Sequence, residues 1–122
     1  MHDLIETIFS ISNDIRYVAV YCNDKLDSSV KPGLEGASDS ESDKYEELIV
    51  NPTILTLVDQ RGKIDCGGTR YVLIRYGNFF QFITPIQNGH ISVCIEKNAD
   101  PLKIAKPILE VLRPYNKINS DI

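Results

Sequence analysis

The sequence has few of the residues from which metal sites, thiol active sites and disulfide frameworks are built. It holds three cysteines, an odd number without C-x-x-C spacing, and two isolated histidines, His2 and His90. Dispersed thiols and imidazoles provide no ligand spacing for a metal ion. No third group is evident that would orient a histidine as the base for a thiol such as Cys66. We therefore expect no catalytic residue, no metal and no cofactor, and free thiols in a reducing, cytoplasmic setting.

Long apolar runs and broad positive charge are also missing. No run approaches the roughly 20 apolar residues of a membrane span, and no signal segment precedes the first expected helix. The formal net charge is −4, and six of the seventeen acids but one of the thirteen bases lie between Gly33 and Glu47. The rest of the chain is close to neutral, so it builds no positive field for nucleic acid or an anionic membrane. We expect neither as a partner.

What the sequence does contain is enough hydrophobic residues, 43% of 122, for one globular domain over residues 1–122. Apolar residues from Asp3 to Ser12 form one broad stripe, which predicts an amphipathic helix. Ile15 to Cys22 is rich in β-branched and aromatic residues and apolar on both faces, which predicts a central strand. After a turn at Asn23-Asp24, a weak strand is expected from Lys25 to Val30.

Residues 31–42 combine proline, glycine, serine and acids, which predicts an exposed acidic loop. Ser40 and Asp43 resemble a helix start. Helical spacing then continues to about Gln60 through apolar residues Tyr45, Leu48, Ile49, Leu55 and Val58. Pro52 interrupts this pattern because proline lacks the amide proton and clashes with the preceding turn. We expect either a kink or two short helices, the second capped by Asn51.

The clearest stretch runs from Thr69 to Lys97, after an expected loop at residues 61–68. Three apolar segments are separated by the dipeptides Gly77-Asn78 and Asn88-Gly89, which supply the positive φ of tight hairpin turns. A three-stranded antiparallel meander is predicted. Asp100 and Pro101 then predict the start of a helix. Residues 115–122 are expected to form a flexible C-terminal tail.

This region could also be interpreted as a phosphate-binding loop or as a nucleic-acid-binding surface, but a simple turn and a buried core explain the same residues better. The pair Gly67-Gly68 with nearby basic residues could hold a phosphate, but phosphate loops run from a strand into a helix, and here the order is reversed. The aromatic residues between Arg70 and Phe82 could stack on bases. Both faces of these strands are apolar, however, so most of the rings are expected in the core.

The segment from Thr69 to Tyr76 is better explained as an edge strand. Apolar edge strands are usually covered or paired, and antiparallel pairing with a second copy satisfies both edges with two-fold symmetry. We therefore expect a homodimer. Its interface is assigned to alternate strand residues and to apolar residues of the neighbouring helix: Thr69, Tyr71, Leu73 and Arg75, with Tyr45, Ile49 and Leu55.

The element order resembles that of the roadblock/dynein light-chain family, whose fold is similar to profilin and longin domains. The likeness rests on RYVAVY (16–21), GGTRYVLIRYG (67–77) and ISVCIEKNADPLKIAKPIL (91–109). Small archaeal proteins of this type offer the nearest likeness. Two departures are the long acidic loop before the second helix and Pro52 within it.

The resemblance implies an α+β fold with element order α-β-β-α-β-β-β-α. The five-stranded antiparallel sheet would carry the middle helix on one face and the terminal helices on the other. Family members pair through their third strands and regulate small GTPases or act as scaffolds, without catalysis. The alternative is a ligand-sensing module of the PAS or Cache type, with a small molecule between sheet and helix. Fold alone does not decide between these functions.

Overall fold

An antiparallel sheet of five strands forms the centre of the protein. The computed structural model describes residues 2–34 and 40–116. The strand order is β2-β1-β5-β4-β3, so β2 and β3 are the edges. The strands are β1 (Ile15–Cys22), β2 (Lys25–Val30), β3 (Val72–Arg75), β4 (Phe79–Ile86) and β5 (Gly89–Glu96). The expected first hairpin and the three-stranded meander are confirmed.

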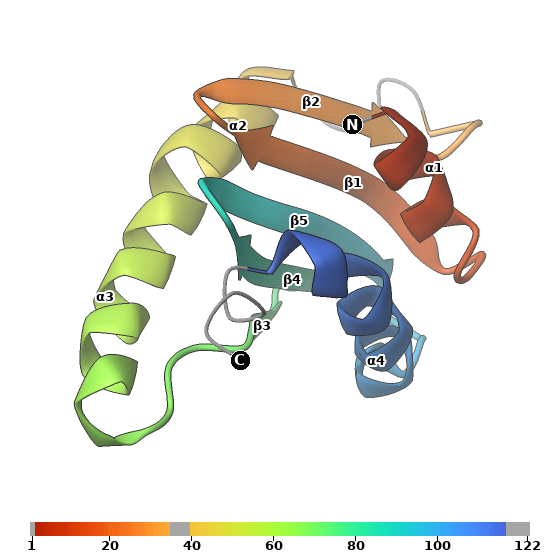
Figure 1. Cartoon of the computed structure of the whole chain (residues 1–122). Coiled ribbons are helices and arrows are strands. Elements are labelled where there is room, and N and C mark those ends of the chain that lie inside the picture. The colour runs from red at the N-terminus through yellow and green to blue at the C-terminus, as the bar shows by residue number, and fades with distance from the viewer. Residues whose placement is uncertain (1, 35–39, 117–122) are drawn as a thin grey trace.

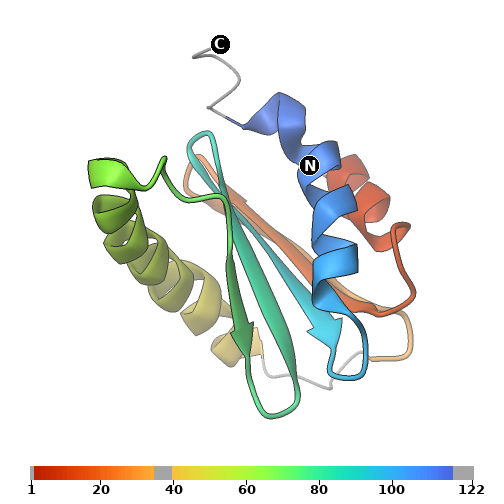
Figure 2. The ribbon, with the colours of Figure 1, turned by 90° about the horizontal axis from the view of Figure 1, so that it is seen from below.

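Helices cover both faces of this sheet (Figures 1 and 2). They are α1 (His2–Phe9), α2 (Ser40–Tyr45), the π-helical η1 (Glu46–Val50), α3 (Asn51–Asp65), α4 (Pro101–Leu112) and the short 3-10 helix η2 (Arg113–Tyr115). Figure 2 shows α3 on one side of the sheet and α1 and α4 on the other. The predicted α+β architecture is therefore confirmed. Within the described ranges, no helix combines the length and apolar character that crossing a membrane requires.

The two faces of the sheet are packed very differently. Beneath α1 and α4 lies the main core, where fully buried Ile5, Ile8 and Ile108 meet Phe82 and Val93 of the sheet. The face toward α3 has a much smaller apolar cluster, built on Tyr17, Ala19 and Cys94. Because hydrophobic stabilisation scales with buried apolar area, the α1–α4 side supplies most of it.

Pro52 does not split the middle helix, contrary to the expectation of a kink or two capped helices. Helical structure runs from Ser40 to Asp65, with η1 just before the proline. The wider turn is closed by a bond from the Asn51 N–H to the Glu46 carbonyl, five residues back. This turn accommodates a residue that has no amide proton. Asn51 itself has helical backbone angles and a buried side chain, so it does not cap α3.

The expected loop at residues 61–68 is also wrong in its first half, because α3 continues to Asp65. Two ion pairs at i,i+4 spacing stabilise this last turn: Lys63 with Asp59 at 3.0 Å and Arg61 with Asp65 at 2.6 Å. The N–H of Gly68 then bonds to the Gly62 carbonyl. Gly67 and Gly68 both have positive φ, +81° and +84°, as glycines that end helices commonly do.

Smaller differences concern the ends of elements. The third strand was expected from Thr69 but begins at Val72, and α1 ends at Phe9 rather than Ser12. Asp100 caps α4 as predicted, its carboxylate accepting from the Leu102 N–H at 3.2 Å. Residues 35–39 of the predicted acidic loop and 117–122 of the predicted tail lie outside the described residues.

Candidate functional site

The surface of the middle helices carries most of the exposed apolar side chains. Eight large hydrophobic side chains are exposed in the described ranges, and six of them lie between Tyr45 and Ile64. These six, which we call the apolar helix surface, are Tyr45, Leu48, Ile49, Leu57, Val58 and Ile64. A group of this kind on one helical segment marks an interaction surface more often than chance exposure does.

Strand β3 is an open edge of the sheet. It pairs with β4 on one side only, from Val72 opposite Ile83 to Arg75 opposite Phe80. The Tyr76 N–H bonds to the Phe79 carbonyl, toward β4. Because backbone groups alternate in direction along a strand, those of Leu73 and Arg75 point outward. No strand in the part of the chain that the structure describes pairs with them.

The structure places the seven predicted interface residues in three groups. Tyr45 and Ile49 are 60% and 52% exposed and belong to the apolar helix surface. Leu73 and Arg75 lie on β3, and Tyr71 just before it stacks on Phe82 with ring centroids 5.2 Å apart. Leu55 and Thr69 instead line a cavity between α3 and the sheet.

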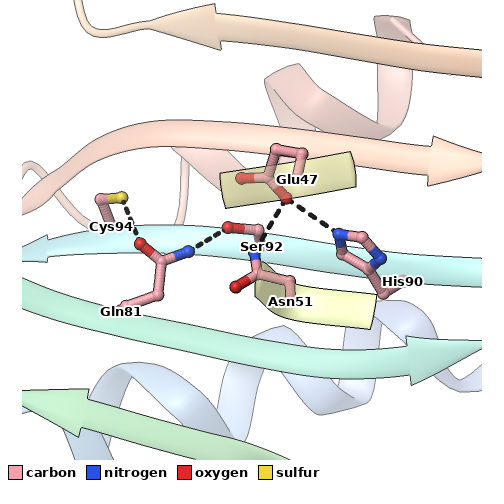
Figure 3. A network of polar contacts seen from close by, with 6 residues as sticks. All are labelled: Glu47, Asn51, Gln81, His90, Ser92 and Cys94. Carbon is pink, nitrogen blue, oxygen red and sulfur yellow. Dashed lines mark hydrogen bonds and ion pairs between the residues drawn. The ribbon is translucent and has the colours of Figure 1, made fainter. Parts of the chain in front are cut away.

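A buried contact between a glutamate and a histidine holds the start of the middle helix against the sheet (Figure 3). Glu47 of η1 is completely buried, and its Oε1 lies 2.8 Å from Nε2 of His90 on β5. The same oxygen accepts a hydrogen bond of 3.0 Å from the side-chain amide of Asn51. Buried charges persist where they are paired and hydrogen-bonded. Glu47 is therefore an anchor of the helix, and not part of the solvated acidic stretch to which the sequence assigns it.

A second polar chain lies next to this pair on the same face of the sheet. The Gln81 side-chain amide donates to the Ser92 hydroxyl, and the Cys94 thiol donates to Gln81 Oε1 at 3.1 Å. Burial, reinforced by the charge of Glu47, raises the pKa of the Cys94 thiol well above its ordinary value. The thiol is thus held neutral, which makes it a hydrogen-bond donor and a poor nucleophile.

The sequence carried a signal for this network that we did not use. His90, Ser92 and Cys94 alternate along β5 with Ile91, Val93 and Ile95. Period-two alternation puts the first three on one face of the sheet, where they need polar partners if a helix covers them. The match to Glu47 and Asn51, which are four residues apart and share a helix face, required the fold.

Two further groups mark the outer end of the network. The Glu46 carboxylate accepts from the Tyr76 hydroxyl at 3.3 Å, which joins η1 to the chain just after β3. Burial and the neighbouring Glu47 charge raise the pKa of Glu46. Burial and the charge of Glu46 raise the pKa of Tyr76. This contact joins the start of the middle helix to the turn that follows β3.

Across residues 2–34 and 40–116, no group of three or more histidine, cysteine or acidic side chains is placed to hold a metal ion. Cys66 is exposed, with its thiol 3.3 Å from the Asp65 carboxylate. His2, in α1, lies 3.2 Å from the carboxylate of Glu6.

Comparison with known proteins identifies the architecture. No family model matches the sequence, and no curated protein matches it. Among solved structures, a Roadblock/LC7 domain from Streptomyces avermitilis superposes with a TM-score of 0.68 at 14% identity, over 94% of this chain and 96% of that one. MglC from Myxococcus xanthus superposes with a TM-score of 0.59 at 12% identity, over 99% and 98%. Both organisms are bacteria, so the expected likeness to archaeal proteins gains no support. At these identities the likeness concerns the fold, and the chain has a roadblock-like fold.

Proposed function

We propose that the protein is a non-catalytic regulatory or scaffolding module that works as a homodimer. Two observations carry this proposal: the open edge of β3 and the apolar helix surface. An unpaired edge and exposed apolar side chains are both costly in water, and one two-fold interface would cover both. We place the module in the cytoplasm, where its three free cysteines stay reduced.

Antiparallel pairing of two β3 strands has one favourable register. Centred on Leu73, it sets Tyr71 opposite Arg75 of the second copy and uses the outward backbone groups of both residues. Centred on Arg75, it would set two arginines opposite each other, and like charges at directly opposed positions destabilise a sheet. The Arg75 side chain bonds to the carbonyls of Tyr76 and Gly77.

Substitution at Leu73 tests the pairing. Leu73→Pro removes an outward backbone N–H that has no hydrogen-bond partner in the monomer. The monomer should therefore still fold, and the dimer should be lost. Leu73→Ala is the matched control, because it keeps the amide and shortens the side chain. Light scattering across a wide dilution range should give twice the 13.7 kDa chain mass for the natural protein and the alanine variant, and the chain mass for the proline variant. A folded Leu73→Pro dimer would exclude edge pairing, and a natural protein that stays monomeric would exclude the homodimer.

For the partner we propose a small GTPase or a scaffold protein, following the families that the fold resembles. Fold analogy supports this proposal, and no contact in the structure does. Isothermal titration with purified small GTPases, loaded with GDP or with a GTP analogue, tests it. Binding that depends on the nucleotide would support regulation. Binding to neither form by any GTPase tested would leave the scaffold role as the surviving proposal.

A further inference from the structure

A cavity of about 440 Å³ lies between α3 and the face of the sheet. Its walls come from α3, from residues 67–70 that lead into β3, and from the turn between β4 and β5. This volume falls within the range of small-molecule sites, which is roughly 300–1,000 Å³. The proposed dimer does not require the cavity, because the β3 edge and the apolar helix surface lie outside it.

The cavity exists because α3 is fixed at both ends and bridges the space between them. Only Asn51 and Gly62 of its fifteen residues are buried. Asn51 bonds to Glu47, which reaches His90 on the sheet. At the other end, a Cβ on Gly62 would lie 3.3 Å from the Gly68 backbone and from the Thr69 hydroxyl. The twelve residues from Asn51 to Gly62 span about 16 Å of helix, and Leu55, Thr56 and Asp59 line the space below.

The lining combines an apolar wall with a few polar groups. Pro52, Leu55, Pro85 and Ile86 supply apolar surface. His90 also lines the cavity, and Figure 3 shows its second ring nitrogen on the side away from Glu47. A mostly apolar cavity with few convergent polar groups is the usual composition of a small-molecule site.

The charge of the lining favours an anion. Asp59 is neutralised by Lys63, whose ammonium lies 3.0 Å from its carboxylate. Arg70 is an exposed residue that also lines the cavity, and its guanidinium has no hydrogen-bond or ion-pair partner among the described residues. Arginine binds carboxylate and phosphate groups through paired N–H donors. A ligand with one such group can therefore bind Arg70 while its apolar part contacts Leu55 and Pro85.

We propose that this cavity binds a small amphipathic anion, with an aromatic or branched aliphatic body and one carboxylate or phosphate group that pairs with Arg70. The ligand would fill the space under the middle of α3. It would thereby add packing to a helix that the protein itself fixes only at its ends.

Binding of defined probes tests the proposal. The probes are 1-naphthoate and phenyl phosphate, with 1-naphthamide as the neutral counterpart of the naphthoate. In heteronuclear NMR titrations, the backbone amides of Gly67, Gly68 and Gly89 report on the lining. Naphthoate or phenyl phosphate should shift these signals, and naphthamide should bind about tenfold more weakly because it lacks the charge that pairs with Arg70. Equal binding of naphthoate and naphthamide, or no shift of these signals with any probe, would overturn the proposal.

Three variants separate the cavity from the rest of the surface. Arg70→Gln should weaken the anionic probe about tenfold. Arg61→Gln removes an exposed arginine that does not line the cavity, and it should leave the affinity unchanged. Leu55→Trp should fill the cavity and abolish binding. If the Leu55→Trp variant does not fold, Thr56→Phe serves as the cavity-filling variant in its place. Equal affinity in the Arg70 and Arg61 variants, or undiminished binding in a folded cavity-filling variant, would exclude this site.

Discussion

The carboxylate of Glu47 lies 2.8 Å from Nε2 of His90, and the two side chains are 0% and 3% exposed. The residues are 43 positions apart in the sequence, and their contact joins η1 to β5. Its desolvation is costly, so the pair by itself is weak evidence of stability. Its structural effect is to fix the position of η1, at the start of the middle helix, against β5 of the sheet.

The first prediction concerns this pair. His90→Leu leaves the Glu47 carboxylate buried without its partner and should lower the free energy of unfolding by about 3–5 kcal/mol. Glu47→Leu should also destabilise, because it removes the acceptor of the Asn51 amide. The double variant should be about 2 kcal/mol more stable than the sum of the single changes predicts. Urea denaturation of the four proteins measures this coupling, and strictly additive losses would show that the pair does not act as a unit.

The second prediction is a pH dependence at Glu46. Burial and the Glu47 charge raise its pKa above the ordinary value of 4.5, so the folded state holds this proton more tightly than the unfolded state does. Its contribution to stability is therefore largest below pH 4.5 and is lost as the pH rises through the raised pKa. Glu46→Gln keeps an acceptor for Tyr76 and avoids the buried charge.

The midpoint of thermal unfolding should consequently rise in Glu46→Gln by roughly 2 °C at pH 7, a small gain because the site is half exposed and screened. The gain should shrink as the pH is lowered to 4.5. Glu41→Gln, on the exposed start of the same helical run, is the control and should show no such trend. A gain that is constant with pH would contradict the raised pKa.

The features of the fold that depend on local sequence could be predicted, and those that depend on contacts between distant residues could not. The β-branched and aromatic residues of IRYVAVYC and the dipeptide Asn88-Gly89 predicted β1 and the last hairpin, because strand propensity and turn chemistry are local. Pro52 misled the helix prediction, because the π turn of η1 directly before it lets the helix continue. The partner of Glu47 could not be predicted, because burial of a charge depends on residues distant in sequence. The cavity follows from how far α3 stands from the sheet, which no local pattern encodes.

The third prediction concerns Gly89, at the start of β5. An ideal Cβ there would lie 1.7 Å from the Tyr21 carbonyl oxygen, so the backbone of β1 or β5 must move to accept any side chain. Gly89→Ala should lower the free energy of unfolding by about 2–3 kcal/mol. Gly77→Ala is the matched control, because nothing lies within 4 Å of the corresponding position, and it should change stability by less than about 1 kcal/mol. Equal effects of the two substitutions in urea denaturation would show that the close approach of β1 to Gly89 does not limit the side chain at this position.

The fourth prediction tests the apolar helix surface. Ile49→Lys should change the stability of the monomer by less than about 0.5 kcal/mol, because the side chain is already exposed. It should weaken the proposed dimer at least about tenfold, since a charge would be buried in the interface. Leu102→Lys replaces an equally exposed leucine of α4, on the opposite face, and should leave the dimer intact. Sedimentation equilibrium of the two variants distinguishes them, and equal dimer affinities would remove the helix from the interface.

Because α3 is attached mainly at its two ends, we expect it to unfold locally before the rest of the protein does. Opening this helix exposes little apolar surface and leaves the main core intact, so its central amides should exchange with deuterium through local fluctuations. The amides of β5, between β1 and β4 in the sheet, should exchange only through global unfolding. The same helix is then the segment that proteases reach first, and any partner or ligand that holds it closed would lengthen the lifetime of the protein in the cell.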